Sequence, residues 1–229
     1  MSPLLEAQGL EAGHEGMAVV HKLDLAVNAG EIVVLLGANG AGKTTTLLTL
    51  AGDLPPIAGT VLLDGRPAPR SLHARARRGL RFITEERSVL MGLTVADNLR
   101  LVHRDITPCL ELFPELERLL GRKAGLLSGG EQQMLTLARA VAGDGRLLLA
   151  DELSLGLAPL VVKRLLAAVG AAANRGMGVV LVEQQARLAL EIADRGYVLR
   201  QGEVILAGRA SELRSNMAQI ESSYLSTVL

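Results

Sequence analysis

Residues 37–45 read GANGAGKTT, and this stretch decides the fold of the chain. It matches the phosphate-loop pattern GxxxxGK[ST], whose four fixed positions are filled by Gly37, Gly42, Lys43 and Thr44. Five apolar residues, 32–36, precede the loop and are typical of a buried parallel strand. The run 44–51 follows and is typical of a helix that Gly52 closes. A strand, a glycine-rich loop and a helix in this order predict an α/β fold.

The composition of the loop predicts a site for a nucleoside triphosphate. Glycines let backbone N–H groups turn toward phosphates, and the following helix adds unpaired N–H groups and a positive dipole end. In this pattern Lys43 reaches the β- and γ-phosphates, and the Thr44 hydroxyl binds Mg²⁺. The predicted ATP-binding residues of the loop are Gly37, Ala38, Asn39, Gly40, Ala41, Gly42, Lys43, Thr44 and Thr45.

The composition argues against several other classes of protein. The 229 residues carry 24 basic and 24 acidic side chains, and aromatic residues make up 2%, so neither a basic field nor stacking surfaces indicate nucleic-acid binding. Cys109 is the only cysteine, which fits a reducing compartment. No uncharged apolar run approaches the about 20 residues that span a bilayer, and no secretory leader is visible. We therefore expect contact with a membrane only through a partner.

The hydrophobic pattern predicts strands toward both ends of the chain and helices between them. Strands are expected over 4–8, 22–27, 60–63, 80–84, 147–150, 179–182, 197–199 and 203–206. Helices are expected over 70–78, 94–102, 114–120, 128–142, 160–174 and 185–193, with a weakly helical tail over 208–229. We expect a solvated face for the basic stretch that carries Arg70, Arg75, Arg77 and Arg78.

The order of these elements predicts one domain, 1–229, with a helical insertion. Residues 1–84 and 146–229 would form the catalytic core, together with a small antiparallel β subdomain near the N-terminus. The alternation of residues 22–27 suits a half-exposed antiparallel strand. Residues 85–145 would form the insertion.

Two acids directly follow the apolar strand 147–150. A strand buried on both faces has little reason to end in two carboxylates unless a cation lies there. In nucleotide hydrolases with a phosphate loop, such acids hold Mg²⁺ and polarise the attacking water. We predict Asp151 as the Mg²⁺ residue and Glu152 as the general base, with Lys43 as a further catalytic group. The alternative is a strand that leads into an acidic loop, and the phosphate loop upstream weakens it.

A third motif, LSGGEQQ, occupies residues 127–133. Ser128 and Glu131 have the spacing of a capping box at a helix N-terminus. Capping does not explain Gly129 and Gly130, since each glycine costs about 1 kcal/mol relative to alanine inside a helix. A helix N-terminus built from serine and glycine is also an anion site. We expect both roles here.

In this order, the phosphate loop, LSGGEQQ and LLLADE (147–152) resemble the motifs of ABC ATPases, and the resemblance covers nearly the whole chain. It implies a P-loop NTPase fold with a RecA-like core and a mixed sheet, with ATP and Mg²⁺ as ligands. It also implies that two such subunits pair head to tail. Ser128, Gly129, Gly130 and Glu131 of one subunit would then cover the γ-phosphate held by the other.

The resemblance assigns roles to further residues. His14 falls where the family has an aromatic residue on the adenine, although a plain surface histidine is the alternative. Glu85 falls where most members have a glutamine that contacts Mg²⁺ and senses the transmembrane partner. Gln184 falls where most have a histidine on the γ-phosphate, and we predict that its side-chain amide donates there. The loop 154–157 matches the one that crosses the dimer interface, but Leu153 replaces the usual proline.

Several stretches resemble the ATPase subunits of branched-chain amino acid importers in particular. They are LTVADNL (93–99), SLGLAP (154–159), ADRGYVL (193–199) and VEQ (182–184). Arg87 matches that subfamily, whereas Glu86 replaces its usual glycine. The resemblance implies a peripheral subunit on the cytoplasmic face of the inner membrane, with permease partners and, indirectly, a solute-binding protein.

Three alternatives to this function remain open. The nearest is the ATPase of an importer for urea or short-chain amides, because none of these motif residues touches the solute. A soluble ABC ATPase of DNA repair or translation is a second, although this chain is single, short and neutral. A module that binds nucleotide without hydrolysis is the third, and Lys43, Asp151 and Glu152 argue against it.

Overall fold

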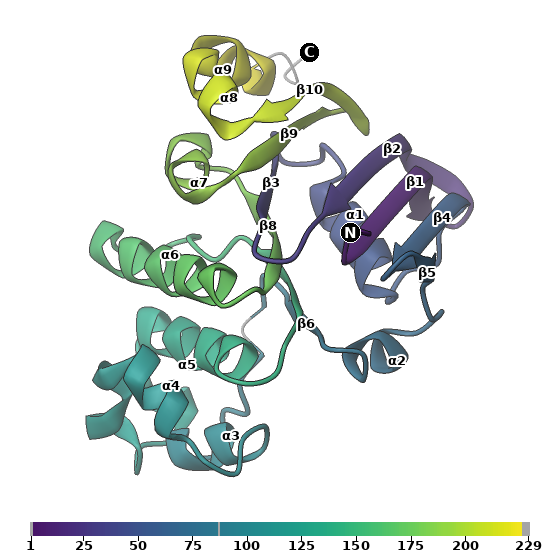
Figure 1. Ribbon diagram of the computed structural model, residues 1–229. Coiled ribbons are helices and arrows are strands. Elements are labelled where there is room, and N and C mark those ends of the chain that lie inside the picture. Colours follow the sequence, from purple (N-terminus) through teal and green to yellow (C-terminus); the bar gives the residue numbers. More distant parts are fainter. Residues whose placement is uncertain (1, 87, 226–229) are drawn as a thin grey trace.

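The computed structural model describes residues 2–86 and 88–225, so Arg87 and the last four residues of the expected helical tail lie outside the described part of the chain. Its strands form two sheets, one of six strands and one of four (Figure 1). The six-stranded sheet runs through the middle of the molecule. Helices α5 (Gly129–Val141) and α6 (Pro159–Asn174) lie on one side, and α1 (Lys43–Ala51) and the smaller sheet lie on the other.

The six-stranded sheet has the order β10-β9-β3-β8-β7-β6. These strands are β3 (Ile32–Leu36), β6 (Leu80–Ile83), β7 (Leu147–Asp151), β8 (Gly178–Glu183), β9 (Arg195–Arg200) and β10 (Glu203–Arg209). All neighbours are parallel except β9 and β10, which confirms the predicted mixed sheet. Every residue of β3, β7 and β8 is buried, as their apolar composition requires.

The register of the parallel strands places their carboxyl ends at one edge. Leu36 pairs with Glu183, and Asp151 pairs with Val182. The loops that follow β3, β7 and β8 therefore meet, and ligands of open α/β sheets bind in the crevice outside such strand ends. The phosphate loop, the acid pair and Gln184 come together for this reason.

The smaller sheet is antiparallel, with the order β2-β1-β4-β5. Its strands are β1 (Leu5–His14), β2 (Met17–Val27), β4 (Ala58–Leu63) and β5 (Arg66–Pro67). β1 and β2 are longer than predicted, because irregular register between Ala7 and Gly13 accommodates the glycines and leaves only Glu15 and Gly16 as the turn. Val33 and Leu35 of β3 share a core cluster with this sheet and α1.

The segment between β6 and β7 is helical, as expected. It contains α3 (Val95–Arg100), α4 (Thr107–Leu112), α5 and the 3₁₀ helices η1 (Pro114–Leu119) and η2 (Ala124–Leu126). α4 was not predicted. The helix predicted at 114–120 is present as the 3₁₀ helix η1, in which Leu116 and Leu119 are buried in the core at a spacing of three residues.

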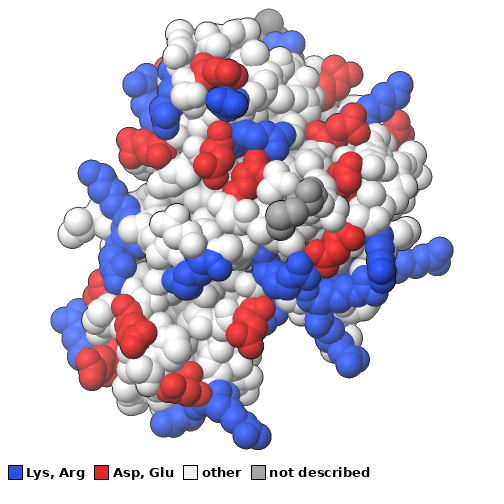
Figure 2. Space-filling view, in the orientation of Figure 1, with Lys and Arg blue, Asp and Glu red and all other residues white. Residues whose placement is uncertain are grey.

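The basic stretch before β6 is only partly solvated. α2 (Leu72–Ala76) is shorter than predicted, and Arg75 is buried rather than exposed. The Arg75 guanidinium donates to the carbonyls of Thr49 and Leu50 at 2.8 and 2.6 Å, where it caps the carboxyl end of α1. Lys and Arg side chains gather over α2 and β5, and elsewhere on the visible face basic and acidic side chains are interspersed (Figure 2).

The remaining helices are α7 (Ala186–Ile192), α8 (Ala210–Ser215) and α9 (Met217–Leu225). α8 and α9 lie together beside the β9–β10 edge of the sheet (Figure 1). No helix among the described residues is long and apolar enough to cross a membrane.

Candidate ATP-binding and hydrolysis site

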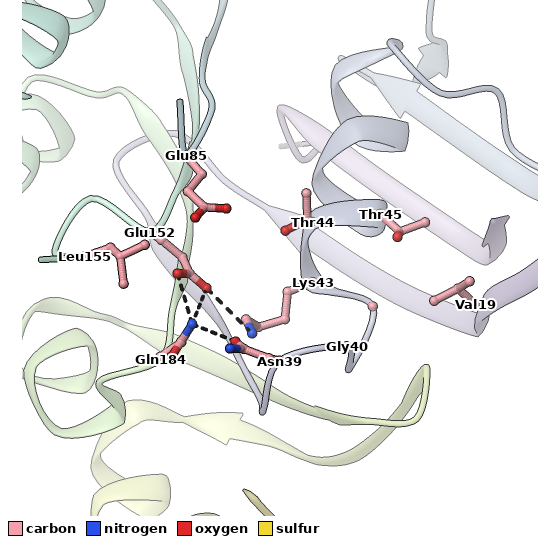
Figure 3. A pocket seen from close by; sticks show the side chains of 11 residues that line it. Val19, Asn39, Gly40, Lys43, Thr44, Thr45, Glu85, Glu152, Leu155 and Gln184 are labelled. Atoms are coloured by element: carbon pink, nitrogen blue, oxygen red, sulfur yellow. Dashed lines mark hydrogen bonds and ion pairs between the residues drawn. The ribbon is translucent and has the colours of Figure 1, made fainter. Parts of the chain in front are cut away.

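A pocket of about 370 Å³ lies where the carboxyl ends of β3, β7 and β8 meet the N-terminus of α1 (Figure 3). Its lining residues come from five separate parts of the chain. They are Val19, Asn39, Gly40, Gly42, Lys43, Thr44, Thr45, Glu85, Glu152, Leu155 and Gln184. The pocket therefore brings the predicted phosphate loop together with the predicted base, the predicted γ-phosphate contact and Glu85.

The phosphate loop adopts a conformation that needs its glycines. Gly40 and Gly42 have φ of 79° and 98°, a backbone conformation that is strained for any residue with a side chain. A Cβ at Gly37 would lie 2.4 Å from the carbonyl oxygen of Leu199 on β9. Gly42 precedes α1 without a side-chain cap, which leaves the first N–H groups of that helix for an anion.

Lys43 lies inside the loop rather than in solvent. Its Nζ donates to the carbonyl oxygens of Gly37 and Ala38 at 2.9 and 3.1 Å, and the residue is only 5% exposed. Burial lowers the pKa of this amine, against the opposing effect of the nearby carboxylates, of which Glu152 contributes most. A triphosphate would supply the compensating negative charge at this position.

Glu152 is held between a cation and an amide. One carboxylate oxygen lies 3.9 Å from Lys43 Nζ. Gln184 Nε2 donates to both carboxylate oxygens, at 2.8 and 3.0 Å, and to Asn39 Oδ1 at 2.7 Å (Figure 3). Glu152 also has φ of 46°, which is costly for a residue with a side chain and is typical of functional sites.

Asp151 is the more deeply buried acid of the pair, and the residue is 2% exposed. Burial, the largest effect, raises its pKa, whereas a hydrogen bond from Thr44 lowers it. Its Oδ1 is buried and has no hydrogen-bond partner among the described residues. An unsatisfied carboxylate oxygen next to the Thr44 hydroxyl, with Glu85 on the pocket wall, fits Mg²⁺.

The described residues contain no group of three or more His, Cys, Asp or Glu side chains that could hold a metal by themselves. Mg²⁺ does not need one, because it keeps several waters and is bound through one or two carboxylates plus substrate phosphates. The donor set of Thr44, Asp151 and Glu85 therefore suits an ion that arrives with a nucleotide.

The LSGGEQQ motif lies outside this pocket. Ser128 and Glu131 form the predicted capping box: the Ser128 N–H donates to Glu131 Oε2 at 2.8 Å, and the Glu131 N–H donates to Ser128 Oγ at 3.3 Å. Gly129 and Gly130 form the first turn of α5. Contact of Ser128, Gly129, Gly130 and Glu131 with a partner's nucleotide stays a prediction.

His14 also lies outside the set of lining residues, exposed at the end of β1. Val19 of β2 lines the pocket in that region instead. The predicted contact of His14 with adenine therefore stays a prediction.

Sequence reasoning missed Glu183, which directly precedes Gln184. This carboxylate is 2% exposed and accepts hydrogen bonds from the N–H and Oγ of Ser154, at 3.1 and 2.5 Å. Burial, opposed by these hydrogen bonds, raises its pKa to about 7. The available signal was an acid at the end of the apolar run 178–182, the same pattern that identified Asp151.

Comparison with known proteins identifies the class of this molecule. The ABC transporter family matches residues 20–154. The high-affinity branched-chain amino acid transport ATP-binding protein BraG of Pseudomonas aeruginosa is 38% identical over 218 residues, 90% of this chain and 92% of that protein. The lipopolysaccharide export system ATP-binding protein LptB of Escherichia coli K12 is 35% identical over 221 residues, 91% of this chain and 92% of that protein.

Solved structures agree with the fold. A structure described as the ATP-binding subunit of an ABC transporter superposes with a TM-score of 0.84 at 27% identity, covering 97% of this chain and 98% of that one. An ATP-binding cassette in its ADP conformation gives a TM-score of 0.87 at 22% identity, covering 98% and 99% of the two chains. This chain belongs to the ABC transporter family as an ATP-binding subunit, and its activity is ATP hydrolysis.

Proposed function

We propose that this chain is the ATPase subunit of an importer for branched-chain amino acids and that it hydrolyses ATP at the pocket beside the phosphate loop. The proposed ATP hydrolysis rests on one observation: Glu152 contacts both Lys43 and Gln184 beside the phosphate loop. A general base, a phosphate-binding cation and an amide donor thus lie within reach of one bound triphosphate.

In this mechanism the chain acts mainly by positioning and by electrostatic stabilisation. The loop N–H groups and Lys43 bind the β- and γ-phosphates. Thr44, Asp151 and Glu85 would hold Mg²⁺, and the bound ion would neutralise negative charge on the phosphate oxygens. Glu152 orients the attacking water and accepts its proton.

Gln184 controls when Glu152 is available. Its Nε2 donates to both oxygens of the base. A γ-phosphate oxygen is a stronger acceptor for this amide than the Asn39 carbonyl that it also contacts. Rotation of Gln184 toward the phosphate would free a Glu152 oxygen for water, so that the base becomes available when ATP is in place.

The working unit in this proposal is a head-to-tail pair of ATPase subunits bound to permease subunits. The position of residues 128–131 outside the pocket supports this arrangement, because a second subunit must then supply them. One related ATP-binding cassette of a bacterial ABC transporter has been solved as a dimer, with a TM-score of 0.79 at 22% identity, covering 90% of this chain and 98% of that one.

A second cavity, of about 420 Å³, supports contact with a permease. It is lined by Glu85, Glu86, Met91, Gln133, Glu152, Leu153, Leu155 and Leu157. Glu85 and Glu152 line this cavity and the ATP pocket alike, and the exposed side chains of Leu90, Met91 and Leu93 lie on the segment that forms its rim. A permease segment here would reach the catalytic acids directly, from the cytoplasmic face of the membrane.

The solute assignment rests on the four importer-like stretches of the sequence and on BraG, and LptB is similar to nearly the same degree. The test reconstitutes the chain with its permease subunits in vesicles and adds a solute-binding protein loaded with leucine, urea or acetamide. Stimulation of ATP hydrolysis by leucine alone supports the proposal. Stimulation by urea or acetamide, or by lipopolysaccharide instead of any solute, contradicts it. A Glu152→Gln variant, which should be inactive throughout, is the control.

A further inference from the structure

Glu183 connects two functional segments that the chain separates by 29 residues. It is the last residue of β8, and the next residue is Gln184. Its carboxylate accepts the N–H of Ser154 with one oxygen and the Ser154 hydroxyl with the other. Ser154 begins the loop 154–157 and lies two residues after Glu152.

Elsewhere in the loop, Leu155 and Gly156 are exposed and Leu157 packs against the hydrophobic core. The backbone bonds of the loop are long, with Leu155 N to Glu152 O and Leu157 N to Ser154 O both at 3.3 Å, and Gly156 has φ of 69°. Glu183, in contrast, is part of a fully buried strand between β3 and β7. The carboxylate therefore ties a partly exposed loop to a fully buried strand in the middle of the six-stranded sheet.

The surroundings of Glu183 are unfavourable for a group with no role. The charged groups that act on it are the carboxylates of Glu152 and Asp151, and Glu183 in turn contributes to the field at Lys43. A third buried carboxyl in this cluster costs free energy, and an apolar side chain would fill the same place without that cost. Buried ionisable groups with perturbed pKa values and specific charged neighbours are typical of functional sites.

We propose that Glu183 is a positioning residue, which holds Ser154 so that the loop 154–157 is set for the dimer interface and Glu152 is set for water. This inference rests on the proposed function, in which that loop crosses to the second subunit. Because Glu183 and Gln184 are adjacent on the chain, Gln184 and the loop are held relative to one another through one peptide unit and one side-chain contact.

The test compares Glu183→Ala, Glu183→Gln and Ser154→Ala. Alanine at 183 removes both hydrogen bonds. Glutamine can restore both, because its amide oxygen accepts the Ser154 N–H and its amide N–H donates to Ser154 Oγ. Ser154→Ala removes only the hydroxyl contact and leaves β8 intact, so it tests the tie even if Glu183→Ala folds poorly.

The measurements are kcat, ATP affinity and ATP-dependent dimer formation, the last with each change placed in the Glu152→Gln background. We expect Glu183→Ala to lower kcat by between about 10- and 100-fold and to reduce dimer formation, with ATP affinity unchanged. Ser154→Ala should show the same pattern more weakly, and Glu183→Gln should recover most of kcat. The double change of Glu183 and Ser154 to alanine should be no worse than Glu183→Ala alone.

Two results would overturn the inference while the wild type hydrolyses ATP and dimerises. One is a Glu183→Ala protein with normal kcat and dimer formation. The other is a loss of ATP affinity equal to the loss of kcat that glutamine does not rescue, which is the pattern of a merely structural residue. If the wild type itself neither hydrolyses ATP nor dimerises when its partner subunits are present, the proposed function fails first.

Discussion

Replacement of Glu183 by glutamine should change how the stability of the nucleotide-free protein depends on pH. The ordinary pKa of a glutamate is 4.5, and burial raises that of Glu183 to about 7. Between these values the folded protein binds a proton that the unfolded chain has already lost. The stability of the wild type therefore falls as pH rises through this window. Glutamine carries no such proton, so the variant lacks this dependence.

The expected change in the free energy of unfolding follows from the shift in the pKa of Glu183. At about 1.4 kcal/mol for each pH unit, a shift from 4.5 to about 7 corresponds to about 3 kcal/mol as an upper value. The difference in free energy of unfolding between Glu183→Gln and wild type should thus move in favour of the variant by up to about 3 kcal/mol between pH 4.5 and pH 8. Asp151 and Lys43 also have shifted pKa values, but they are present in both proteins and largely cancel.

Urea unfolding at pH 5, 6, 7 and 8 measures this difference directly. Glu203→Gln is a matched control, since it removes one exposed carboxylate from β10 without touching the site. The control should show no comparable trend. If the difference for Glu183→Gln stays flat from pH 5 to pH 8, or moves in favour of the wild type, then burial does not raise the pKa of Glu183.

Three further predictions concern the pocket. Gln184→Ala should lower kcat by about 10²- to 10³-fold, because a donor to the phosphate is lost; a wild-type rate of hydrolysis would remove Gln184 from the mechanism. Asp151→Asn should raise the melting temperature without nucleotide, because it removes a buried carboxylate whose pKa burial raises, and should abolish the stabilisation that Mg²⁺ adds to that of ATP alone; a variant that Mg²⁺ still stabilises in the presence of ATP contradicts the metal assignment. His14→Ala should weaken ATP binding several-fold in an equilibrium titration, and unchanged affinity would leave His14 as a surface residue.

The central part of the fold was predictable because its signals are local. An apolar run followed by GxxxxGK[ST] implies a buried strand, a loop and a helix, and these occur as β3, 37–42 and α1. Parallel strands end at the same edge, so the meeting of Lys43 with Glu152 also followed from the sequence. The capping box of Ser128 and Glu131 is another local pattern, and it is present.

Other features depend on contacts between distant residues and could not be predicted. The bonds from Arg75 to the end of α1 require the packing of two elements, and nothing in the stretch 70–78 distinguishes Arg75 from its exposed neighbours. The tie between Glu183 and Ser154 likewise joins the end of β8 to the loop that follows the neighbouring strand β7. The extent of β1 and β2 depends on irregular pairing, which local turn signals at Gly13 concealed.

A comparison of the wild type with Glu152→Gln tests the proposed catalytic base most directly. It measures ATP hydrolysis and molecular mass in the presence of ATP and Mg²⁺. The partner subunits are added where the wild type alone is inactive. We predict that the wild type turns over. The variant should bind ATP, stop hydrolysing it and accumulate as a dimer by size exclusion. A Glu152→Gln protein that hydrolyses ATP at the wild-type rate, or that binds ATP and stays monomeric beside its partner, would contradict the mechanism.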